Sequence, residues 1–282
     1  MDRIRHAAPG FAASRRRMAL AALHCGLALI AGLALSGCSL TSASGSASTG
    51  SSGTAATSAS PAVSIPGTHR STAVYAISAP VSALVVTSRV GNVTVTGASG
   101  SAASVTEEIT YTSKPPATTR SVSGGTLTVG YSCPVELVCA VVYRIQVPRT
   151  AAVQVTANAG RIALSGLAGQ VTAKADAGLI TATGLTGASV SLTTDVGAIT
   201  AYFAAAPVTI AAVTRIGAIT LRVPSAASYL VIANASFGQA TVRIPQDPSA
   251  PHTIRATADV GAILVTYLGA SGQGSAGQSI GN

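Results

Sequence analysis

A short phrase of alternating apolar and polar residues returns along the chain, each time around a glycine. In the copy around Gly178, apolar residues lie seven and five positions before the glycine and two and four positions after it. The other copies centre on Gly91, Gly160, Gly197, Gly217, Gly238 and Gly261. Alternation with a period of two on both sides of a fixed glycine predicts a strand, a sharp turn and a second strand.

The spacing of the copies indicates how they assemble. From Gly160 onward the distance between glycines grows from 18 to 23 residues, while the phrase itself keeps its length. One such unit cannot bury its own apolar face, so the units must stack on one another. Parallel stacking at about 4.8 Å per coil keeps the strands in register while the corner loop lengthens. We therefore expect an all-β fold, a β-helix-like parallel β-solenoid of about seven coils that follow one another in sequence order.

Antiparallel hairpins packed as a sandwich are the main alternative. They would need two-residue turns of the Asn-Gly type between adjacent strands, and such turns are largely absent.

The stretch between Gly91 and Gly160 interrupts the repeat. Within it, residues 105–111, 126–131 and 140–147 alternate as strands do. A bare sheet edge recruits other chains, so a terminal coil needs protection. We expect this N-terminal β excursion to cover the first coils.

The beginning of the chain has the features of an export signal. Arg15, Arg16 and Arg17 precede an apolar stretch from Met18 to Leu35 that is too short for a dedicated membrane span. The stretch ends in Leu-Ser-Gly-Cys, which resembles the lipobox of bacterial lipoproteins and implies a diacylglycerol on Cys38. A plain secretory peptide with an incidental cysteine is the alternative. Residues 14–18 also resemble a twin-arginine signal, so the export route stays open.

Composition and pattern divide the whole chain into four segments. Residues 1–37 form the expected lipoprotein signal peptide, and 38–67 the lipidated cysteine with a tether rich in Ser, Ala, Thr and Gly. Residues 68–268 form the solenoid domain, and 269–282 a tail that we expect to be disordered.

The charge of the chain does not favour nucleic acid as a partner. The net charge of +9 falls to +5 once the signal peptide is removed, and no run of basic residues remains.

The remaining cysteines and histidines allow two inferences. Cys133 and Cys139 flank a short loop in an exported protein, so we expect a disulfide between them. His69 and His252 have no partners at ligand spacing, so we expect neither a metal nor another cofactor.

Stacking would align equivalent residues into files along the surface. The file two residues before the glycine holds Asn158, Asp176, Asp195, Arg215, Ser236 and Asp259. Calcium ligands or paired catalytic carboxylates are one interpretation. Hydrogen bonding of Asn and Asp at corners is the one we favour.

A second file, three residues after the glycine, holds Thr94, Thr181, Thr200, Thr220 and Thr241. It could bind ice or sugar, but the β-propensity of threonine explains it more simply. The neighbouring file one residue after the glycine is not a threonine file. Three tyrosines considered as sugar platforms do not share a file: Tyr202, Tyr229 and Tyr267.

The known catalytic motifs are absent from the sequence. There is no Gly-x-Ser-x-Gly elbow, phosphate-binding loop or His-Glu-x-x-His motif, and the acids are scattered. The sequence therefore predicts no enzyme. The alternative is a β-helix enzyme acting on cell-wall polysaccharide, which would need acids that converge on a cleft.

From about Val74 to Leu268 the chain resembles the bacterial putative-adhesin domain family of unknown function. The resemblance rests on residues 146–148 with 153–155 and on the Gly-x-Ile-Thr phrases at Gly178, Gly197 and Gly217. It implies a β-solenoid-like domain at the cell surface, with no catalytic residues to carry over.

These observations lead to one expectation of function. The protein is expected to be held at the extracytoplasmic face of the cell membrane by the lipid on Cys38, as a non-catalytic interaction or structural module. The partner would be an unidentified surface protein or glycan. Self-association through the last coil, at residues 263–268, is a further alternative.

Overall fold

The computed structural model describes residues 67–134 and 138–269, and these form seventeen strands. The described part of the chain contains no helix, and hence none long and apolar enough to cross a membrane. The expectation of an all-β fold built mostly from parallel strands is confirmed.

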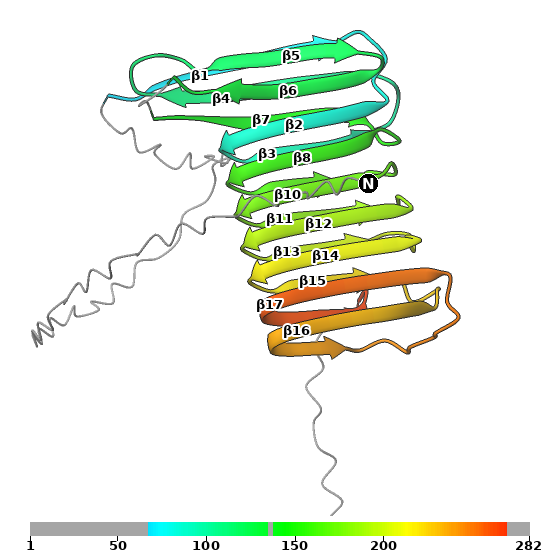
Figure 1. Ribbon diagram of the computed structural model, residues 1–282. Helices are drawn as coiled ribbons and strands as arrows, with labels where there is room; N and C mark the ends of the chain where they lie inside the picture. Colours follow the sequence, from blue (N-terminus) through cyan, green and yellow to red (C-terminus); the bar gives the residue numbers. More distant parts are fainter. Residues whose placement is uncertain (1–66, 135–137, 270–282) are drawn as a thin grey trace, which may run out of the picture. The chain divides into compact units, whose positions relative to one another are not determined.

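Each of the phrases at Gly91, Gly160, Gly178, Gly197 and Gly217 forms one layer, which consists of a strand, a turn at the glycine and a second strand (Figure 1). The strands before the glycine form a first parallel ladder, and the strands after it form a second. The first ladder contains β2 (Ala83–Val90), β8 (Ala152–Ala159), β10 (Val171–Ala177), β12 (Ser189–Val196) and β14 (Thr209–Ile216). The second contains β3 (Val93–Ala98), β9 (Ile162–Ser165), β11 (Ile180–Leu185), β13 (Ile199–Phe203) and β15 (Ile219–Val223).

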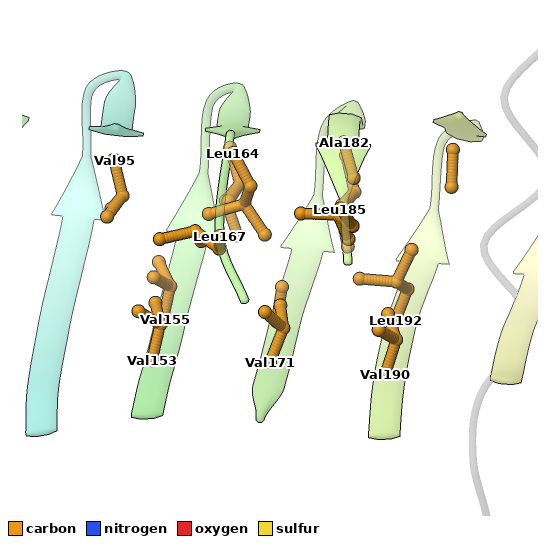
Figure 2. Close-up of a cluster of buried hydrophobic side chains, with 14 of the residues drawn as sticks. Val95, Val153, Val155, Leu164, Leu167, Val171, Ala182, Leu185, Val190 and Leu192 are labelled. Atoms are coloured by element: carbon orange, nitrogen blue, oxygen red, sulfur yellow. The ribbon is translucent and has the colours of Figure 1, made fainter. Parts of the chain in front are cut away.

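The core lies between the two ladders, where apolar side chains of successive layers stack in files (Figure 2). Ile180, Ile199 and Ile219 are direct partners in the second ladder and are at most 1% exposed. The prediction that they point inward from parallel layers is confirmed. Burying one such side chain contributes roughly 1.5–3 kcal/mol, so the files are a main source of stability.

The central glycines form a file of their own, with φ between +130° and +153°. L-residues rarely adopt this conformation. In addition, a Cβ built on Gly197 would overlap the carbonyl oxygen of Gly178, and one on Gly217 would overlap that of Gly197. The turns therefore require glycine both for their backbone conformation and for the close approach of the next layer.

The last two copies do not stack in sequence order. β16 (Tyr229–Val242) and β17 (His252–Tyr267) each run through their glycine and join both ladders. β17 pairs with β14 and β15 on one side and with β16 on the other, so the glycine order is 217, 261, 238 (Figure 1). The expectation of sequential stacking is wrong at this point.

The inward side chains give a physical reason for this order. Ile263 of β17 pairs with Ala240 of β16, and Ile254 pairs with Val231. β17 therefore occupies the interior position, because its larger aliphatic side chains are stabilised more by burial on both sides.

The N-terminal excursion covers the Gly91 layer, as expected. β6 (Thr126–Ser132) pairs in parallel with β2, and β7 (Cys139–Pro148) with β3. Three more strands then add on in antiparallel fashion: β4 (Ala103–Tyr111) on β7, β1 (His69–Ile77) on β4, and β5 (Ala117–Ser123) on β6. The sequence pattern indicated β4, β6 and β7 but neither β1 nor β5.

Candidate interaction surfaces

The aspartate file lies on the outer face of the first ladder, at outward strand positions. Because β17 follows β14, Arg215 lies between the strands that carry Asp195 and Asp259. Its Nε is 3.8 Å from Oδ1 of Asp195, and both side chains are exposed, so this pair is worth less than about 1 kcal/mol.

The corner hydrogen bonds that we expected from this file do not form. Among the hydrogen bonds and ion pairs of the described residues, the only one that involves these aspartates is the ion pair between Asp195 and Arg215. The amide that does act at a corner is Asn92, whose Oδ1 accepts a hydrogen bond from the backbone N–H of Arg161 at 3.0 Å. The described residues also contain no group of three or more His, Cys, Asp or Glu side chains that could hold a metal ion.

The threonine file lies on the outer face of the second ladder and has a hydroxyl-rich neighbour that the sequence analysis missed. This neighbouring file lies five residues after each glycine. It contains Thr96, Ser165, Thr183, Tyr202, Arg222 and Thr266. Ser165 Oγ donates to Thr96 Oγ1 at 3.2 Å. Tyr202 and Arg222 interrupt the file, with the guanidinium carbon 5.7 Å from the ring centroid.

A shallow polar pocket lies at the β4 end of this face. Its lining includes Thr94, Thr96, Thr106 and Arg144. Arg144 Nε donates to Glu108 Oε1 at 3.0 Å, so the only basic side chain of this lining is already paired.

An apolar strip runs along the corner where the layers turn. It consists of the residue before each glycine, in stacking order Val90, Ala159, Ala177, Val196, Ile216, Val260 and Phe237. Val196, Ile216 and Val260 are 46–51% exposed and Phe237 is 74% exposed. Contiguous exposed apolar side chains mark interaction sites more often than isolated ones do. We call this feature the corner strip; it was not predicted from the sequence.

Three of the candidate aromatic and histidine side chains have internal partners: Tyr229, His69 and His252. The Tyr229 hydroxyl donates to the Pro224 carbonyl at 3.0 Å, and burial raises the pKa of Tyr229 to about 12. His69 stacks on Tyr111 at 5.2 Å between ring centroids. His252 Nδ1 lies 2.9 Å from the Pro207 carbonyl oxygen. Tyr229 is thus part of the core rather than a sugar platform.

Among the described carboxylates, that of Glu107, at the N-terminal end of the stack, is fully buried. Both oxygens of Glu107 accept hydrogen bonds from Arg120 Nη1 at 2.8 Å. The Arg120 guanidinium also lies 3.6 Å from the ring centroid of Tyr75. Burial, and secondarily Glu107, raises the pKa of the nearby Tyr143 hydroxyl. We call these residues the Glu107 cluster; they connect β1, β4, β5 and β7 inside the fold.

The structure contains the expected disulfide between Cys133 and Cys139. It joins β6 to β7 at the corner where the other layers have a glycine turn. The Tyr131 hydroxyl connects this corner to β2, because it accepts a hydrogen bond from Val90 N at 2.5 Å and donates one to Val90 O at 2.6 Å. The proposed lipidation site, Cys38, lies outside the described residues.

No family model and no curated protein matches this chain. Solved structures do resemble it. One, a putative cell adhesion protein from Clostridium sporogenes, has a TM-score of 0.40 and 12% identity and aligns over 71% of this chain and 100% of its own.

Two further solved structures are putative adhesins. The protein from Bacteroides fragilis has a TM-score of 0.35 and 13% identity over 70% of this chain and 97% of its own. The protein from Parabacteroides merdae has a TM-score of 0.26 and 12% identity over 70% of this chain and 96% of its own. The structural neighbours of this chain are therefore putative adhesins, the kind of protein that its sequence resembles.

Proposed function

We propose that this protein is an exported lipoprotein whose domain is a β-solenoid of glycine-centred layers and acts as a non-catalytic, adhesin-like module. The signal peptide at 1–37 is removed, Cys38 carries the lipid, and residues 38–67 tether the domain at the extracytoplasmic face of the membrane. The observation that carries the interaction role is the corner strip.

The corner strip has the chemistry of a protein-binding site. Its side chains are repeated at the layer spacing of about 4.8 Å. Each additional Val, Ile or Phe that a partner buries completely adds up to roughly 1.5–3 kcal/mol before the costs of association. A protein surface with a row of apolar side chains could cover this strip.

A protein is better supported than a glycan as the partner. Sugar rings bind mostly on exposed aromatic faces, whereas Tyr229 is buried in the core and the corner strip is aliphatic except for Phe237. The enzyme alternative is less well supported, because Asp176 and Asp195 point outward from neighbouring strands of an outer face and do not converge on a groove.

The interaction role is tested by a binding screen of the full chain against cell-surface and matrix proteins and wall glycans. The test variant is Val196→Ser/Ile216→Ser, and its control is Thr193→Ser, which changes the outer face of the first ladder instead. We expect the test variant to lose at least tenfold in affinity for a bound protein and the control to lose less than twofold. Unchanged affinity in the test variant would reject the corner strip as the binding site.

The anchor is tested separately by cell fractionation. We expect Cys38→Ala to leave the membrane fraction, because two or more acyl chains provide the stable part of membrane binding. Retention of the variant in the membrane at the wild-type level would show that Cys38 is not the anchor.

A further inference from the structure

β16 is an edge strand that the fold leaves open. Among the described strands it pairs only with β17, along its whole length of 14 residues. Within residues 67–134 and 138–269, pairing on its outer side is confined to the start, where Tyr229 forms a bridge with Gln246 and Val231 N donates to Gln246 Oε1 at 3.1 Å. From Ala233 to Val242, no described residue pairs with the outer side of the strand.

The sequence of β16 has none of the usual protections of an edge. The strand contains no charged residue and no proline. Natural proteins normally place lysine, proline or a covering segment on such an edge, because its free N–H and C=O groups are a template for another strand. At the opposite end of the stack, the edge strands themselves contain charged residues, Arg70 in β1 and Arg120 in β5.

The interior of the stack is also incompletely covered at β16. Ala240 occupies an inward position but is exposed, whereas its partner Ile263 in β17 is 1% exposed. Phe237, the most exposed member of the corner strip, is on the same strand. A further layer placed on β16 would therefore pair backbone groups and cover apolar surface together.

We propose that this further layer is β16 of a second copy, paired antiparallel about a two-fold axis. A second copy presents the same uncharged edge, so the pairing brings no like charges together. The edge strands at the opposite end of the stack contain arginine, so the assembly closes as a dimer and does not grow into a fibre. This inference does not depend on the lipid anchor or on a partner of the corner strip.

Sedimentation equilibrium of the full chain, extracted in a density-matched mild detergent, tests the proposal. We expect the wild type to have the mass of a dimer. Asn234→Lys/Ser236→Lys places two lysines at outward positions of β16 and should give monomers. Ser191→Lys/Thr193→Lys adds the same charge to the interior strand β12, where Lys174 of the neighbouring strand already occupies the equivalent file, and should stay dimeric.

Backbone hydrogen exchange of the wild type provides a second measurement that does not depend on how the variants fold. Between Ala233 and Val242, the amides of β16 that point away from β17 should be protected at high protein concentration and lose at least tenfold in protection on dilution to monomer. A monomeric wild type, a dimer that survives the β16 lysines, or β16 protection independent of concentration would each overturn the proposal. The last result would indicate that the edge is covered from within the same chain.

Discussion

The two ends of the stack show two different ways of finishing the same parallel ladders. At the N-terminal end, the chain switches to antiparallel pairing through β1, β4 and β5, and the Glu107 cluster and a disulfide connect the added strands. At the C-terminal end, the ladders stop at β16, which has no charged side chain. The difference indicates that one end is built to stay closed to further strands, whereas the other is suited to accept one.

The middle of the stack is where we expect a substitution to be most costly. Gly197→Ala introduces a Cβ that overlaps the Gly178 carbonyl, at a φ of +145°. Strain and overpacking together should reduce the free energy of unfolding by about 4 kcal/mol or more, measured by chemical denaturation. Gly100→Ala has a positive φ but nothing within 4 Å, so it should cost only about 1 kcal/mol. If both variants lost the same free energy of unfolding, close stacking of the glycines would not be the cause of the loss.

At the N-terminal end, Arg120→Ala removes the partner of the buried Glu107 carboxylate. Breaking a buried pair on one side costs about 3–5 kcal/mol, and we expect the lower value because the Arg120 side chain is 24% exposed. The control is Arg144→Ala, which breaks the exposed pair with Glu108 and should cost less than about 1 kcal/mol. If both variants lost the same stability in denaturant unfolding, the Glu107 cluster would not be what holds this end closed.

The disulfide should have a smaller effect at the same end. Cys133→Ser/Cys139→Ser removes the cross-link between two cysteines that are 6 residues apart in sequence. From the chain entropy of a loop of this length, we expect the free energy of unfolding to fall by about 2 kcal/mol. Hydrogen exchange should increase in β6 and β7 and stay unchanged in β16. An increase in β16 would contradict the independence of the two ends.

The repeat made much of the fold predictable from the sequence. Period-two alternation around the glycines was sufficient to place Ile180, Ile199 and Ile219 in one interior file, because a slip of one residue would have turned them all outward. The excursion strands β4, β6 and β7 were recognised by the same alternation. β1 was not, because in place of large aliphatics its first half carries small and polar residues such as Ser71 and Thr72.

Other features depend on contacts that the pattern does not contain. β16 and β17 carry the same phrase, so the phrase does not determine which of them stacks next to β14 and β15. That order follows from which strand is stabilised more by burial, as the pairing of Ile263 in β17 with Ala240 in β16 illustrates. The corner strip was readable in principle, since its members directly precede each glycine. Its exposure follows from the turn, because Val196 and Ile216 would face inward if the strand continued straight.

The layer order is the central structural claim, and disulfide trapping tests it directly. Arg215 and Asp259 lie level on adjacent strands, whereas Arg215 and Ser236 are two strands apart. Bridged cysteines need Cα atoms within about 7 Å, a distance that adjacent strands about 4.8 Å apart satisfy and strands two positions apart do not. Under mild oxidation, Arg215→Cys/Asp259→Cys should form the intramolecular disulfide and Arg215→Cys/Ser236→Cys should not, as peptide mapping will show. The reverse result would mean that the copies stack in sequence order and would contradict the account.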